Sequence, residues 1–226
     1  MGKITSAEQT CERLINSTGQ LIAEIGVTAV STRAIAHKSG ENIGSIHYHF
    51  GNKNNLFKAV VKRAISNAKI RDYHNIINKL TIKTATPTKL SLLIRSIVHE
   101  EIDNLFRSNQ PLWHTQVIYQ ILQRDDELFE IVHKNLLIPD IEVMWKFFKF
   151  IEPSISQEHA CLRTCIFKLP IYSHINYMVA ILKSINASSF DENYLQQMEE
   201  LLTTQTQLLL GLPIDAQLIQ KKEINL

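Results

Sequence analysis

The sequence predicts an all-α protein in which a compact N-terminal unit precedes a bundle of longer helices. Apolar residues recur at helical spacing along most of the chain, and the hairpin dipeptides Asn-Gly and Asp-Gly do not occur. Six of the seven Gly lie within the first 51 residues, whereas all six Pro fall at or after Pro87. This division predicts tight turns in the first part and long helices, punctuated by Pro, in the second.

Length and composition are those of a soluble globular protein. The chain has 226 residues, 45% of them hydrophobic, which is enough for one large or two small domains with ample core. No stretch approaches the roughly 18 uninterrupted apolar residues of a membrane span, and the start lacks the charged-then-apolar pattern of a signal peptide. We therefore expect a cytoplasmic protein.

Charge is distributed unevenly along the chain. Up to Lys83 there are 12 Lys and Arg against 5 Asp and Glu, a net charge of +7. The remainder has 12 against 17, a net −5, and the two parts sum to the overall +2. Such sign asymmetry is typical of a phosphate-binding domain joined to a domain that does not bind phosphates.

The first predicted helix covers residues 6–25. Its apolar positions, including Leu14 and Ile22, recur at helical spacing, and Gly26 ends the run. We interpret it as a core helix that supports the segment after it.

Residues 31–53 predict a helix-turn-helix. Thr32 is suited to cap a short first helix, and Gly40 supplies the permissive backbone at which that helix must stop. Asn42 is suited to cap the second helix, which we expect to run from about Ile43 to Phe50.

The second helix has an inner and an outer face. Ile46 and Phe50, four residues apart, share the face that packs against the first helix. The outer face carries Ser45, His47, Tyr48 and His49. We interpret this outer face as a reading face.

The remaining chain predicts further helices. Asn52 is suited to cap a helix whose apolar stripe extends from Leu56 to Ala68. Two further helices are predicted over residues 89–107 and from Pro111 to Leu122. The next helix begins at the acidic residues 125–127 and bends near Pro139. The last two are predicted over 156–187 and 191–210. The segment 156–187 is apolar on more than one face, so it either crosses a core or enters a second interface.

The helix-turn-helix residues carry a family resemblance. In order they are Thr32, Ile35, Ala36, Ser39, Gly40, Asn42, Gly44, Ser45, Ile46, Tyr48, His49, Phe50 and Lys53. This pattern resembles the DNA-binding domain of the TetR family of transcriptional regulators over residues 6 to about 66. Two positions depart from it: Glu41 replaces a small apolar residue, and His47 replaces an aromatic.

The resemblance implies a division of the chain and a set of partners. We predict a DNA-binding domain over 1–80, with the helix-turn-helix at about 31–50, and an effector-binding and dimerisation domain over 88–226. The resemblance implies a homodimer formed through the last two helices and a small-molecule effector. Within the family, the region from Trp113 to Ile151 distantly resembles the C-terminal domain of the CecR-type subgroup.

Two sets of site residues follow. Those expected to contact double-stranded operator DNA are Thr32, Arg33, Asn42, Ile43, Ser45, His47, Tyr48, His49 and Lys53. Polar and aromatic residues proposed to line an effector pocket are Trp113, His114, Tyr119, Trp145, Phe148, His174 and Tyr177, although aromatic residues at helical spacing are more often plain core. We predict no metal site and no cofactor.

Residue types that bind metals or carry out catalysis also occur in the sequence. His159, Cys161 and Cys165 form the only local cluster with metal-ligand residue types, but no fourth ligand is evident and Cys is frequently a small core residue. No nucleophile elbow, paired zinc-binding His motif or Gly-rich phosphate loop occurs. The sequence therefore gives little support to an enzyme.

We predict a ligand-responsive transcriptional regulator, most simply a repressor that an effector releases from a palindromic operator. Its expected location is the bacterial cytoplasm, at the nucleoid when it is bound to the operator. One alternative is a DNA-binding regulator controlled by a protein partner or by Cys redox or metal chemistry. A small helical enzyme or adaptor is a remote alternative.

Overall fold

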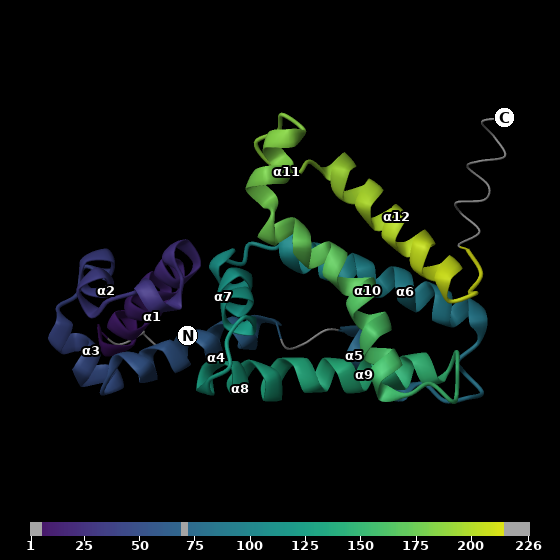
Figure 1. The fold of residues 1–226 in the computed structure, drawn as a ribbon, viewed down its shortest axis with the longest axis horizontal. Helices are drawn as coiled ribbons and strands as arrows, with labels where there is room; N and C mark the ends of the chain where they lie inside the picture. Colours follow the sequence, from purple (N-terminus) through teal and green to yellow (C-terminus); the bar gives the residue numbers. More distant parts are fainter. Residues whose placement is uncertain (1–5, 69–71, 215–226) are drawn as a thin grey trace. The chain divides into compact units, whose positions relative to one another are not determined.

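The computed structural model describes residues 6–68 and 72–214, and Figure 1 shows their helices. No strand occurs among these residues, so the predicted all-α fold is confirmed. The described chain divides into two compact units. Among the described residues, unit 1 contains 6–68 and 110–138, and unit 2 contains 72–109 and 139–214.

Unit 1 contains the helix-turn-helix. Its helices are α1 (Ser6–Ile25), η1 (Val27–Ala29), α2 (Thr32–Ser39), α3 (Ile43–Phe50), α4 (Lys53–Ala68), α7 (Trp113–Leu122), α8 (Glu127–Val132) and the π-helical turn η3 (His133–Leu137). The bounds of α1 and α3 agree with the sequence prediction. Leu14, Ile35, Ile46, Val60 and Val117 are fully buried in one shared core, so α7 completes the core that the N-terminal helices begin.

Helix α7 is held against α1 by a close approach at Gly19. A Cβ atom built on Gly19 would overlap carbons of the Trp113 indole, so the missing side chain leaves room for that ring. Trp113 is itself only 4% exposed. Because loss of a buried Trp side chain costs about 3–5 kcal/mol, this contact contributes substantially to the stability of unit 1.

The compact units divide the chain differently from the predicted domains over 1–80 and 88–226. Segment 110–138 belongs to unit 1 because Trp113, Val117 and Ile121 are buried with α1 and α4. The gap between these two predicted domains falls in a connection between two helices of unit 2. The assignment of functional roles to the predicted domains stays a prediction.

Unit 2 is a second helical core. Its helices are α5 (Asp72–Lys79), α6 (Pro87–Ile102), the π-helical turn η2 (Asp103–Arg107), α9 (Ile138–Lys149), α10 (Gln157–Asn176), α11 (Met178–Ser184) and α12 (Glu192–Leu209). Helix α12 lies alongside α6 (Figure 1). Helix α5 is short and was not among the predicted helices, although Tyr73 and Ile77 bury one of its faces.

A buried ionic cluster joins four helices of unit 2. The Lys168 ammonium on α10 donates to both carboxylate oxygens of Asp140 on α9, at 2.6 and 2.8 Å, and to the Tyr73 hydroxyl at 2.6 Å. Glu101 on α6 lies 3.5 Å from the same ammonium, and His74 lies 3.0 Å from Asp140. Burial raises the pKa of Asp140, but Lys168 and His74 outweigh it, so the pKa lies well below its usual value.

Within residues 6–68 and 72–214, no single helix is long and apolar enough to cross a bilayer. Helices α10 and α11 reach that length and composition only as a pair, which is bent by 77°.

Candidate nucleic-acid interface

The turn between α2 and α3 has the geometry that the sequence predicts, with one correction at its start. Ser31, rather than Thr32, caps α2, because its hydroxyl accepts a hydrogen bond from the Ala34 N–H at 3.1 Å. Thr32 instead occupies the first helical position. Gly40 ends α2 with φ at 71°, a left-handed conformation that suits Gly.

Asn42 caps α3, as predicted. Its side-chain oxygen accepts hydrogen bonds from the Ser45 N–H at 2.8 Å and from the Ser45 hydroxyl at 3.2 Å. The cap satisfies one of the backbone donors that a helix start leaves free. The Ser45 hydroxyl therefore already donates a hydrogen bond within the protein.

The outer face of α3 is exposed and carries aromatic and polar groups. Ile46 is fully buried beneath it, whereas Tyr48 is 84% exposed. His47 is exposed and its Nδ1 lies 3.1 Å from the Gly51 carbonyl oxygen, to which an Nδ1–H donates. His49 is half-buried and packs edge-on against Tyr48, with ring centroids 4.9 Å apart. These contacts orient the two imidazoles along the exposed face.

Lys53 begins α4 beside this face. Its ammonium donates to the Val30 carbonyl oxygen at 3.0 Å and lies 5.3 Å from the centroid of the Phe57 ring. Asn52 caps the same helix by accepting from the Asn55 N–H at 2.9 Å. The start of α4 thus places a lysine ammonium next to a helix N-terminus, an arrangement suited to binding phosphate.

Glu41, one of the two departures from the family pattern, is hydrogen-bonded to side chains of α1. Arg13 donates to Glu41 Oε1 from Nε at 2.8 Å and from a terminal nitrogen at 2.6 Å. The Thr10 hydroxyl lies 3.4 Å from the same oxygen. The guanidinium therefore offsets the negative charge beside the reading helix, and the pair ties the turn to α1.

Comparison with known families places this unit. Residues 14–60 match the family model described as bacterial regulatory proteins, tetR family. The predicted resemblance to the TetR family is confirmed over these residues. Members of this family are DNA-binding transcription factors, and the matched residues include the helix-turn-helix of α2 and α3. Among curated proteins, none matches the sequence.

Solved structures of TetR-family proteins share the fold. NalD of Pseudomonas aeruginosa, the secondary repressor of the MexAB-OprM multidrug efflux pump, is 17% identical, with a TM-score of 0.60 over 93% of this chain and 99% of its own. HlyIIR, a hemolysin II transcriptional regulator, is 17% identical, with a TM-score of 0.57 over 88% and 99%. GusR of Salmonella enterica is 16% identical, with a TM-score of 0.56 over 93% and 100%. At these identities the likeness concerns the fold alone, and the CecR-type resemblance stays a prediction.

The predicted effector residues are distributed over both units. Trp113, His114 and Tyr119 lie on α7 in unit 1, where burial and the charge of Arg63 lower the pKa of His114. The other four lie in unit 2: Trp145, Phe148, His174 and Tyr177. A shared role in binding an effector stays a prediction.

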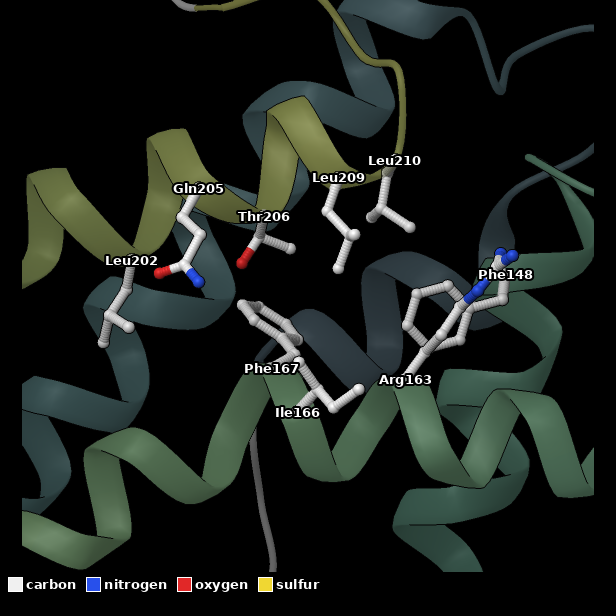
Figure 2. Close-up of a pocket in the computed structure, with 9 residues that line it drawn as sticks. All are labelled: Phe148, Arg163, Ile166, Phe167, Leu202, Gln205, Thr206, Leu209 and Leu210. Atoms are coloured by element: carbon white, nitrogen blue, oxygen red, sulfur yellow. The ribbon is translucent and has the colours of Figure 1, made fainter.

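The four residues of unit 2 have different surroundings. The Trp145 indole donates to the Ile155 carbonyl oxygen at 3.1 Å, and the His174 ring lies 3.1 Å from the Tyr194 hydroxyl. Tyr177 is 62% exposed. Phe148 borders a hollow of about 20 Å³ between α10 and α12 (Figure 2), which has room for about one water molecule and not for an organic effector.

The cysteines do not assemble a larger cluster. Cys11 and Cys161 are half-buried and Cys165 is exposed. In the part of the chain that the structure describes, no three His, Cys, Asp or Glu side chains are placed to hold one metal ion. Burial and the neighbouring Cys161 raise the pKa of the Cys165 thiol, which lowers the thiolate fraction on which reactivity depends.

Proposed function

We propose that the chain is a homodimeric repressor that binds a near-palindromic operator and is released from it by a small-molecule effector. The observation that carries the DNA-binding part is the exposed outer face of α3, with Tyr48, His47 and the Lys53 ammonium at its edge. Within this reading, Thr32 and Lys53 contact phosphates, and Ser45 and His47 lie nearest base edges.

The net charge supports the same assignment. The part up to Lys83 carries +7 and the remainder −5. Attraction between Lys or Arg and the DNA backbone supplies most of the sequence-independent affinity. The basic part therefore provides the attraction that a phosphate-binding unit requires.

An exposed apolar surface on unit 2 supports the dimer. Residues spaced along one face of α10 and along α12 are at least half exposed: Leu162, Ile166, Leu169, Leu201, Leu208 and Leu209. Ile166 and Leu209 line the same small hollow, so the two helices contribute to one surface (Figure 2). Clustered apolar exposure of this kind marks protein–protein interfaces. In the proposed dimer, the same surface of a second copy of the chain covers these apolar side chains.

Two copies solve a problem of specificity. The reading helix has eight residues, long enough for only a few base edges. A dyad places two such helices in successive major grooves when their centres lie about 34–36 Å apart. An effector that binds one separation of the helices better than another would then change operator affinity.

The proposal is tested by footprinting on DNA upstream of the chain's own gene, with the half-sites then moved apart by five base pairs. We expect protection of two half-sites and strong loss of affinity after the shift, because half a helical turn moves one groove to the opposite side. Undiminished binding to the shifted half-sites would contradict the coupled dimer. Absence of any specific protection there and in selected random DNA would contradict the DNA-binding role.

A further inference from the structure

A cleft in unit 1 shares Lys53 with the proposed DNA interface. It is bordered by η1, by the first turns of α4 and by the start of α8, and its volume is about 360 Å³. Small-molecule sites in proteins typically measure roughly 300–1,000 Å³, so this cleft is of ligand size, unlike the hollow between α10 and α12.

The cleft has an apolar floor. Val27, Phe57 and Leu128 contribute side chains that are 6%, 4% and 8% exposed. These three residues come from three different elements, each fixed in the core of unit 1. The floor is therefore pre-formed and suits a flat or compact apolar group.

The rim of the cleft carries three cations, and only two of them form ion pairs with carboxylates of the cleft. Arg124 forms an ion pair with Asp126, and Lys58 forms one with Glu127. Lys53 is different, since the partners that the structure gives it are the neutral Val30 carbonyl oxygen and the Phe57 ring. Lys53 is thus the cation of the rim whose charge no carboxylate of the cleft balances.

We propose that this cleft binds a small organic acid, whose carboxylate takes the Lys53 ammonium and whose apolar body lies on Val27, Phe57 and Leu128. A hydrogen bond between two charged groups is about twice as strong as one to a neutral acceptor. A carboxylate is therefore a better partner for Lys53 than the Val30 carbonyl. The apolar floor distinguishes an organic acid from a bare phosphate.

Occupation of the cleft has a consequence for DNA binding. This step alone rests on the proposed function, in which Lys53 contacts a DNA phosphate. The single positive charge of Lys53 cannot balance both the acid and the phosphate, which repel each other, so each ligand weakens the affinity for the other by the same factor. The acid would act within the DNA-binding unit itself.

The binding step is tested without DNA. 2-Naphthoate is titrated into the full-length protein, and binding is followed by amide chemical shifts of Thr28, Asn54 and Leu128, which line the cleft. We expect saturable shifts at these amides, and about tenfold weaker binding for the neutral analogue 2-naphthamide and for Lys53→Met. Inorganic phosphate should not compete at equal concentration. Equal binding of the amide, or by Lys53→Met, would overturn the role of the charge, and absence of shifts would overturn the site.

A gain of binding provides a test that misfolding cannot imitate. Glu127→Gln releases Lys58 to the cleft, so naphthoate should bind roughly two- to fivefold more tightly, the range expected for an exposed ion pair. Glu130→Gln is the matched control, because Glu130 lies on the same helix outside the cleft and is exposed. If Glu127→Gln, Glu130→Gln and the native protein bound naphthoate equally well, the rim cations would not contribute to binding of the acid.

Competition is measured separately. Operator affinity should fall as naphthoate saturates the cleft, and Glu127→Gln should need less naphthoate for the same effect. Naphthoate binding with unchanged operator affinity would overturn the shared use of Lys53. If the protein proved not to bind DNA, the shift titration would still decide the ligand site by itself.

Discussion

Replacement of Lys53 by Ala gives a quantitative test of the phosphate contact. Each phosphate neutralised by a cation contributes about 0.9 to the slope of log affinity against log salt concentration. A dimer presents two copies of Lys53, so the slope should become shallower by about 1.8. Between 50 and 200 mM salt, a range of about 0.6 log units, the difference amounts to roughly tenfold in affinity.

The substitution also removes an internal hydrogen bond. The ammonium donates to the Val30 carbonyl oxygen at 3.0 Å, so Lys53→Ala should cost about 0.5–1.5 kcal/mol of stability. A loss of stability lowers the fraction of folded protein at every salt concentration, whereas loss of a phosphate contact changes the slope. The slope is therefore the informative quantity.

The assay is fluorescence anisotropy with operator DNA at five or more salt concentrations. Lys62→Ala is the matched control, because Lys62 is exposed on the same helix beyond its first turns. Loss of affinity with an unchanged slope would refute the phosphate contact and would assign Lys53 a purely structural role at Val30. An equal change of slope in Lys62→Ala would show that general positive charge is sufficient.

Three further predictions concern the rest of the molecule. Gly19→Ala should destabilise unit 1 by about 1–3 kcal/mol in urea unfolding through overlap with the Trp113 indole, and an added Trp113→Leu should relieve that overlap. Leu209→Glu should sediment as a folded monomer, while Ile82→Glu, exposed in a turn of unit 2, should stay dimeric; an intact Leu209→Glu dimer would move the interface elsewhere. Asp140 has a depressed folded-state pKa, so its carboxylate stabilises the fold above its unfolded pKa of about 3.9, and this stabilisation is lost as pH falls below that value. Asp140→Asn should cost about 3 kcal/mol at pH 7. In thermal unfolding, the stability of Asp140→Asn should also depend less on pH in acid than that of the native protein.

Local signals in the sequence predicted local structure well. The Gly40 stop and the Asn42 cap depend on side chains within a few residues of each other, and both occur where the pattern placed them. The error at the start of α2 has the same local origin. Ser31 and Thr32 are adjacent hydroxyl residues with similar capping tendency, and the sequence offers no means of choosing between them.

Partners distant in sequence could not be predicted in the same way. Glu41 departs from the family pattern, yet nothing in its neighbourhood indicates Arg13, which lies 28 residues away on α1. The cleft combines residues near position 28, near 55 and near 126, and no periodicity links these segments. Spacing identifies the face of a helix that is buried, but it does not identify what covers that face.

Trp113 illustrates this limit most clearly. As an aromatic residue after Pro111, it was compatible with an effector pocket in a C-terminal domain and with a plain core, and plain core is the commoner case. The deciding information is the absence of a side chain at Gly19, almost a hundred residues earlier, which leaves room for the indole against α1. A Gly in the middle of a helix costs about 1 kcal/mol relative to Ala, so its presence in α1 already required a packing reason. The sequence shows the unfavourable Gly within a helix, but only the fold shows that the Trp113 indole occupies the space that it leaves.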